Sequence, residues 1–261
     1  MASALVSLES GLLKLLSPGE PHVCTGAAYT GKSKMRILLG DAFLARVRGK
    51  TVLDFGCGDG ADAVELARLG AKRVIGVDIR EDLLEKARER ARAAGAERIC
   101  YFGTKADQRA DLIMSLDCFE HFDDPGAILR VMHELLGSDG EVIASFGPTW
   151  YHPYGGHLFS IFPWAHLLFA EAALIRWRST FKSDGARTFR ECQGGLNQMT
   201  IGRFEQIVKE SPFQFAELEL VPIRRLQKLH NHLTREFTTA IVRCRLRRRA
   251  AYTAPLFAKS A

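Results

Sequence analysis

The hydrophobic pattern between residues 51 and 148 alternates short, continuous apolar runs with longer stretches in which apolar residues recur every three to four positions. Continuous runs bounded by turn residues indicate buried strands, and the three-to-four spacing indicates helices packed against them. Strands are expected at 51–55, 73–80, 98–102, 111–116 and 141–147, with helices between most of them. This alternation predicts an α/β fold with a mostly parallel sheet.

The residues outside this alternation predict additions to the sheet. Helices at 4–16 and 34–47 precede the first strand, and a helix from 201 with strands at 213–221 and 236–246 follows later. The stretch between, at about fifty residues, is far longer than an ordinary connection. We expect one structural domain in four parts. Residues 1–50 form an N-terminal helical cover, residues 51–148 and 199–248 form the core, residues 149–198 form a lid, and residues 249–261 form a disordered tail.

Glycines gather where the first strand meets its helix. Gly56, Gly58 and Gly60 follow a strand that contains Asp54. Glycine is needed where the backbone takes a positive φ or approaches a ligand, and the first N–H groups of the next helix face such a turn. About 20 residues later the second strand ends in Asp78, where a carboxylate can accept hydrogen bonds from a ribose diol. The order of these features predicts a mononucleotide-binding half.

Three stretches, VLDFGCGDG, VIGVDIR and DLIMSLDCFEHF, resemble the first, second and fourth motifs of class I S-adenosylmethionine-dependent methyltransferases. Within that group the resemblance is to small-molecule enzymes of the quinone-biosynthesis type, and it covers roughly residues 50–148. It implies a three-layer Rossmann-like fold with a seven-stranded, mostly parallel sheet, one antiparallel strand and a lid after the fifth strand. The implied ligands are S-adenosyl-L-methionine and a small-molecule or lipid-like acceptor that takes the methyl group on oxygen, nitrogen or carbon. The implied donor-site residues are Asp54, Gly56, Cys57, Gly58, Gly60, Asp78, Ile79, Leu116 and Asp117.

Three side chains are candidates for catalysis. His121 follows the fourth strand in a Glu-His pair that resembles the quinone-type group, and an imidazole can take a proton from an acceptor hydroxyl near neutral pH. Tyr151 and His157 lie in a lid segment dense in aromatic residues, glycines and histidines. Each of these side chains could make a polar contact with an acceptor or could simply pack the lid onto the sheet, and the sequence leaves both roles open. The spacing of His121, His152, His157 and His166 fits no standard zinc pattern, so no metal is predicted.

Other interpretations compete with this one. Residues 26–33, GAAYTGKS, match the phosphate-binding pattern G-x-x-x-x-G-K-[ST], but no buried strand precedes them. A cover in which Tyr29 and Lys32 line the pocket, or a solvated loop, is favoured instead. The acid that meets the adenine in this family has one candidate before Asp111, Asp107, in uncertain register. An RNA- or protein-modifying methyltransferase, and a binding protein of this fold without catalysis, stay open as alternatives.

Composition adds little about the acceptor. The net charge of +6 comes largely from the run 245–249, so no nucleic-acid partner is expected. The apolar stretch 158–177, flanked by basic residues, predicts either a buried helix or a peripheral contact with a membrane. Six scattered cysteines without a C-x-x-C pair are typical of a reducing, cytoplasmic compartment. Neither a signal peptide nor a membrane-spanning run is predicted.

Overall fold

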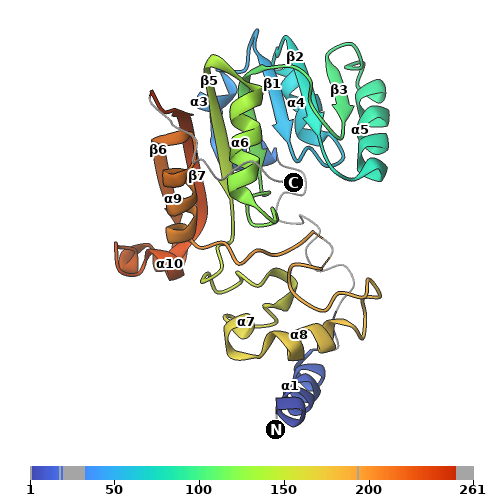
Figure 1. Cartoon of the computed structure of the whole chain (residues 1–261), viewed down its shortest axis with the longest axis vertical. Coiled ribbons are helices and arrows are strands. Elements are labelled where there is room, and N and C mark those ends of the chain that lie inside the picture. Colours follow the sequence, from blue (N-terminus) through green and yellow to red (C-terminus); the bar gives the residue numbers. More distant parts are fainter. Residues whose placement is uncertain (1, 18, 20–32, 193, 251–261) are drawn as a thin grey trace, which may run out of the picture.

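A computed structural model of the chain describes residues 2–17, 19, 33–192 and 194–250. Within these residues the strands form one seven-stranded sheet in the order β3-β2-β1-β4-β5-β7-β6 (Figure 1). Strands β1 to β5 pair in parallel, and β7 runs antiparallel to both β5 and β6. The predicted fold class is confirmed. The strands are β1 (Thr51–Phe55), β2 (Arg73–Val77), β3 (Cys100–Gly103), β4 (Ala110–Leu116), β5 (Leu136–Phe146), β6 (Phe213–Pro222) and β7 (Thr239–Arg248).

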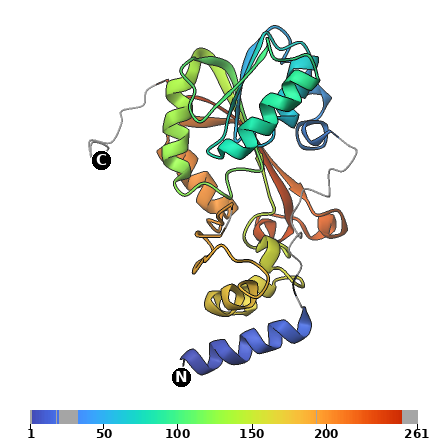
Figure 2. The same cartoon turned by 90° about the vertical axis from the view of Figure 1, so that its right-hand side faces the viewer.

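Helices cover both faces of this sheet, as Figures 1 and 2 show. One apolar core lies between the sheet and α2, α3 and α4, and a second lies between the sheet and α6 and α9. The helices are α1 (Ala2–Leu16), α2 (Lys34–Leu39), α3 (Asp41–Leu44), α4 (Ala61–Arg68), α5 (Glu81–Ala93), α6 (Pro125–Leu135), α7 (Ala165–Leu168), α8 (Glu171–Arg178), α9 (Ile201–Glu210) and α10 (Arg235–Thr238), with 3-10 turns η2 (His157–Phe159) and η3 (Arg224–Leu229).

Helix starts in the core follow from local chemistry. The Asp124 side chain accepts a hydrogen bond from Ala127 N at 2.9 Å, with Pro125 in the first turn of α6. The Thr200 hydroxyl does the same for Arg203 N at 3.1 Å at the start of α9. Both caps were predicted from the sequence, and they fix the helices that pack on the second core.

Three predicted elements differ in extent. The helix expected at 34–47 is two helices, because Gly40 between α2 and α3 takes a φ of 78°. Strand β5 begins at Leu136, earlier than expected, since Leu136 pairs with Ala110 before a register shift. The last strand begins three residues later than predicted, because α10 ends at Thr238, and it continues to Arg248.

The apolar stretch 158–177, for which one buried helix was an expected structure, does not form a single helix. Pro163 has no N–H to donate, Trp164 takes a φ of 64°, and Ala170 is extended, so the segment divides into α7 and α8. Figure 2 shows α1 crossing beneath α8. Leu13 of α1 is fully buried in a third core that also contains Trp177. The predicted cover therefore divides, with α1 on the lid and α2 and α3 on the sheet.

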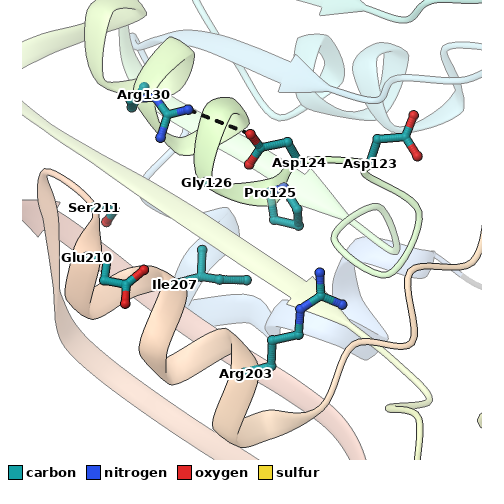
Figure 3. A pocket seen from close by; sticks show the side chains of 9 residues that line it. All are labelled: Asp123, Asp124, Pro125, Gly126, Arg130, Arg203, Ile207, Glu210 and Ser211. Atoms are coloured by element: carbon teal, nitrogen blue, oxygen red, sulfur yellow. Dashed lines mark ion pairs between the residues drawn. The ribbon is translucent and has the colours of Figure 1, made fainter. Parts of the chain in front are cut away.

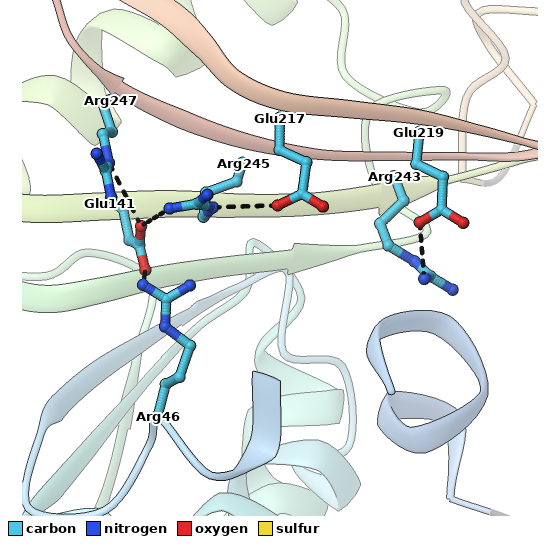
Figure 4. Close-up of polar contacts among 7 residues, drawn as sticks. All are labelled: Arg46, Glu141, Glu217, Glu219, Arg243, Arg245 and Arg247. Carbon is cyan, nitrogen blue, oxygen red and sulfur yellow. Dashed lines mark hydrogen bonds and ion pairs between the residues drawn. The ribbon is translucent and has the colours of Figure 1, made fainter. Parts of the chain in front are cut away.

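The basic run 245–249 lies on β7 and its end (Figure 4). Arg245 and Arg247 approach the Glu141 carboxylate at 3.2 and 3.8 Å, and Arg46 pairs with its other oxygen. The Glu141 side chain is only 7% exposed, so these partners compensate a buried charge. Arg249, which the sequence assigned to the tail, donates to Phe213 O at 2.6 Å, and residues 251–261 lie outside the described part. The basic run is thus structural.

Candidate active site

The glycine loop follows β1 and is tied to the end of β2. Gly56, Gly58 and Gly60 have φ values of 85°, 52° and 76°, a region that side chains rarely adopt. The N–H groups of Gly56 and Cys57 donate to Val77 O at 2.8 and 3.0 Å. A Cβ on Gly56 would lie 2.4 Å from the Cys118 sulfur, so that position accepts only glycine without a shift.

Asp78 lies against this loop. Its Oδ2 accepts a hydrogen bond from Gly58 N at 3.0 Å, and its Oδ1 accepts one from Arg80 N at 3.0 Å. The Asp78 side chain is 12% exposed, whereas the next residue, Ile79, is 90% exposed. The carboxyl ends of β1 and β2 therefore place an acid beside the glycine loop, which is the arrangement the sequence pattern predicted.

The end of β4 forms the other side of this region. Leu116 is buried, and Asp117 takes a φ of 52°, a strained conformation for a residue with a side chain. Lys34 Nζ lies 3.2 Å from both Leu116 O and the Asp117 Oδ2. Sequence reasoning missed Lys34, since nothing in its local pattern connects it with a strand that ends 82 residues later.

Buried acids line the same region. Asp54 is 3% exposed, and its Oδ2 has no hydrogen-bond partner among the described residues. Burial raises the pKa of Asp54 well above its ordinary value, nearby Asp62 and Asp78 add to that, and Lys34 opposes it. Burial also raises the pKa of Asp62, again with Lys34 opposing. A nearby positive charge would stabilise the ionised form of these buried carboxyl groups, as Lys34 already does in part. The region therefore suits a cationic ligand.

Glu120, immediately before His121, is a further buried acid. Its Oε1 accepts a long hydrogen bond from Gly147 N at 3.4 Å, and in the described part of the chain its Oε2 has no partner. Burial, followed by the charge of Asp117, raises the pKa of Glu120 to about 8. The carboxyl group is therefore mostly protonated at neutral pH.

This pKa predicts how Glu120 affects stability. A carboxyl group whose pKa is raised on folding stabilises the protein at low pH, and that stabilisation is lost as the pH rises through the folded-state value, here about 8. Glu120→Gln mimics the protonated acid and removes this loss. Between pH 6 and pH 9 we expect the free energy of unfolding of the wild type to fall by about 2 kcal/mol more than that of Glu120→Gln. Urea titrations at both pH values measure this, and parallel pH profiles would contradict it.

Two of the candidate histidines meet under the lid. The ring centroids of His121 and His157 lie 5.3 Å apart, and the backbone of His157 has a φ of 51°. His121 Nδ1 lies 2.8 Å from Gly195 O, and because a carbonyl only accepts, Nδ1 carries the proton and Nε2 is left as a proton acceptor. Burial lowers the pKa of His121, and burial followed by His121 lowers that of His157 to about 4. Both rings are neutral at pH 7.

The other lid candidates have separate contacts. Tyr151 is 36% exposed, and its ring lies 5.3 Å from that of Phe237. His166 bonds to Ser160 Oγ and Trp150 O at 3.0 and 2.7 Å. The structure thus brings the rings of His121 and His157 together, whereas the ring of Tyr151 packs against Phe237 of α10.

Several residues that the sequence pattern singled out do not join the site. Tyr29 and Lys32 of the phosphate-loop-like segment lie outside the described residues. Asp107 is exposed in the connection between β3 and β4. Among the described residues no three His, Cys, Asp or Glu side chains lie together in a way that could hold a metal ion. The helices in that part of the chain are all too short or too polar to span a membrane.

A surface hollow lies apart from these residues, between the start of α6 and α9 (Figure 3). Its charged side chains partly pair with each other, as Arg130 and Asp124 do at 3.7 Å. None of the donor-site or catalytic candidates lines it. Its lining residues are Asp123, Asp124, Pro125, Gly126, Arg130, Arg203, Ile207, Glu210 and Ser211.

Comparison with known proteins agrees with this geometry. Residues 46–149 match the family described as a methyltransferase domain. The ubiquinone biosynthesis O-methyltransferase of Neisseria meningitidis serogroup C is 38% identical over 108 residues, which are 39% of this chain and 45% of that protein. The match therefore spans less than half the length of that curated relative.

Solved structures share the fold over most of the chain. An S-adenosylmethionine-dependent methyltransferase from Mesorhizobium loti superposes with a TM-score of 0.51 and 20% identity, covering 79% of this chain and 94% of that one. Magnesium protoporphyrin IX methyltransferase from Synechocystis PCC 6803, with bound SAH, gives a TM-score of 0.50 and 19% identity, covering 80% and 81%. Together with the sheet order, these matches show that residues 46–149 resemble a methyltransferase domain and that the chain shares the fold of these methyltransferases.

Proposed function

We propose that this chain is an S-adenosylmethionine-dependent methyltransferase that acts on a small-molecule acceptor. The observation that carries the proposal is the 3.0 Å hydrogen bond between Asp78 and Gly58, which sets a carboxylate against a glycine loop beside an acid-lined strand end. A nucleoside with positive charge at its other end fits this combination.

Each predicted donor-site residue has a role in this proposal. Asp78 accepts hydrogen bonds from the ribose hydroxyls, and exposed Ile79 packs beside the nucleoside. Gly56, Gly58 and Gly60, with Cys57 between them, let the backbone come close to the ligand. Asp54 holds the methionine end directly or through a water. Leu116 and Asp117 flank the donor at the end of β4.

The donor supplies a methyl group on a sulfonium, which is already activated for transfer. The protein therefore has to align the acceptor with it, exclude water, and accept a proton where the acceptor carries one. In this proposal His121 Nε2 is that proton acceptor, because Nδ1 donates to Gly195 O. His157 and the lid aromatic residues close the acceptor side.

The acceptor in this proposal is a hydroxylated aromatic compound related to quinones. The relative from Neisseria meningitidis carries that chemistry in its name, and a lid rich in apolar and aromatic side chains suits such a ring. An RNA- or protein-modifying enzyme is disfavoured because the fourth strand is followed by Asp117 and Cys118 and not by the N/D-P-P-Y tetrapeptide used in base methylation. Catalysis-free binding is disfavoured by the intact glycine loop with Asp78.

Two location hypotheses accompany this function. A peripheral membrane contact through 158–177 stays a prediction, with Leu167 and Leu168 as the exposed large apolar side chains of that stretch, while Leu174 and Trp177 are buried beneath α1. A reducing, cytoplasmic compartment also stays a prediction, in keeping with the free thiols of the described cysteines.

Two experiments test the function. Calorimetry with S-adenosylmethionine measures donor binding, and absence of binding would overturn the proposal. Transfer of a labelled methyl group to hydroxylated aromatic compounds, extracted lipids and total RNA then separates the acceptor classes. Label in the first group supports the proposal, and label only in RNA or in added protein would replace it.

His121→Gln tests the proton acceptor. An amide cannot take the proton, so we expect kcat for a hydroxyl acceptor to fall by about 10²-fold while the donor Kd stays within about twofold. His152→Gln, in the same lid but paired with the Tyr154 backbone, is the matched control. An unchanged kcat in His121→Gln would assign that ring to packing.

A further inference from the structure

Lys34 is a cation beside the proposed donor-site residues at the end of β4. Its ammonium group lies 3.2 Å from Leu116 O and 3.2 Å from the Asp117 carboxylate, the two groups that flank the donor at the end of β4. The Lys34 side chain is 27% exposed. Burial alone would lower its pKa, but Asp117 and Asp62 outweigh burial and raise the pKa above its usual range. The ammonium is therefore charged at neutral pH.

The acids around Lys34 respond to it. Its positive charge opposes the rise in pKa of Asp54, Asp62 and Glu120. Two of these acids, Asp54 and Glu120, each keep one buried oxygen without a partner among the residues described here. Lys34 thus supplies positive charge to this group of buried acids, at the place where a cationic ligand would supply it.

Helix α2, which carries Lys34, is anchored in the core, so the side chain of Lys34 is the part that can move away from the end of β4. Met35, Leu38 and Leu39 of α2 are buried in the core against the sheet. Ser33 caps α2 through Arg36 N and donates to Glu65 Oε1 at 2.7 Å. Rotation of a flexible lysine stem is the small motion that this anchoring leaves.

We propose that Lys34 competes with the sulfonium donor for the end of β4 and so sets the preference of the protein between S-adenosylmethionine and S-adenosylhomocysteine. The inference rests on the proposed function. The two ligands have the same nucleoside and amino-acid ends, but only the donor carries a positive charge on sulfur. A lysine ammonium beside that sulfur disfavours the donor more than the product, and the donor binds fully only after the ammonium leaves Leu116 and Asp117.

Calorimetry of Lys34→Met with both ligands tests the competition. Methionine keeps much of the side-chain volume without the charge, so we expect affinity for S-adenosylmethionine to rise about tenfold relative to that for S-adenosylhomocysteine. Lys72→Met, at an exposed position immediately before β2, is the matched control and should leave the ratio as in the wild type. A ratio in Lys34→Met within twofold of the wild type would overturn the inference. Equal weakening of both ligands would also overturn it, because Lys34 would then bind a group that the two share.

A second measurement uses the unaltered protein. Lys34 should react slowly with an amine-acylating reagent in the free protein and faster when S-adenosylmethionine is bound, whereas the reactivity of Lys72 stays constant. Mass spectrometry of the labelled peptides reads both lysines, and slower or unchanged labelling of Lys34 with the donor would contradict displacement. A wild type that binds neither ligand would instead remove the proposed function, so the two failures are distinguishable.

Discussion

Asp78→Ala is expected to weaken binding of S-adenosylmethionine and S-adenosylhomocysteine by about 100-fold. The variant loses two charge-assisted hydrogen bonds to the ribose, worth together about 3 kcal/mol, and each 1.4 kcal/mol is a factor of ten. It also releases Gly58 N, which the carboxylate holds at 3.0 Å. Isothermal calorimetry measures both affinities directly.

Two controls separate the diol contact from loop order. Asp78→Asn keeps one oxygen that can accept from Gly58 N, whereas its NH2 group faces Arg80 N and can no longer accept from it. We expect this variant to retain the contact with the glycine loop and still lose most of the affinity. Asp82→Ala removes an exposed acid from the first turn of α5 and should bind within about twofold of the wild type. Binding by Asp78→Ala within threefold of the wild type would refute the assignment of the ribose contact.

Gly60→Ala is expected to lower the free energy of unfolding by about 3 kcal/mol. The φ of 76° at Gly60 is left-handed, which costs a residue with a side chain about 1 kcal/mol. The added Cβ would lie 2.7 Å from the Ala87 Cβ and 3.0 Å from the Ala87 Cα, and forcing α4 and α5 apart costs about 1–3 kcal/mol more. Urea unfolding followed by circular dichroism gives the value.

Gly58→Ala is the matched comparison, two residues earlier in the same loop. Its φ is also left-handed, at 52°, but among the described residues no atom lies within 4 Å of an added Cβ. We expect a loss of only about 1 kcal/mol in stability, together with weaker donor binding because the methyl group enters the ligand's space. Equal destabilisation by the two substitutions would show that crowding at Ala87 is not what requires glycine at position 60.

The core could be predicted because its signals are local. Strands β1 and β4 are short, mostly apolar runs, and β1 leads directly into the glycine loop, whereas β4 leads into Asp117. The capping residues Asp124 and Thr200 indicated where α6 and α9 begin, because each accepts a hydrogen bond from the backbone N–H three residues later. The contact of Asp78 with the glycine loop followed from the order of elements, because the carboxyl ends of adjacent parallel strands meet at one edge.

The backbone conformation of the lid and the ion pairs between distant residues could not be predicted from such local signals. Trp164 takes a left-handed backbone conformation that an apolar helical spacing does not reveal, and its hydrogen bonds go to Pro153 O and Tyr151 O, outside its own helix. Lys34 reaches Asp117 across many intervening residues, so no local spacing connects them. The run 245–249 looked like excess charge because its partner, Glu141, belongs to a strand far earlier in the chain.

The pairing of Glu141 with Arg245 and Arg247 also bears on how the protein is made. Strand β7 leaves the ribosome after every other strand of the sheet, yet it lies between β5 and β6. Until it arrives, β5 is an open edge with a carboxylate that still lacks those two partners, and β6 has no neighbour in the sheet. Nascent chains stalled before Thr239 should therefore stay sensitive to protease in this half, and the sheet closes only after translation has passed its last strand.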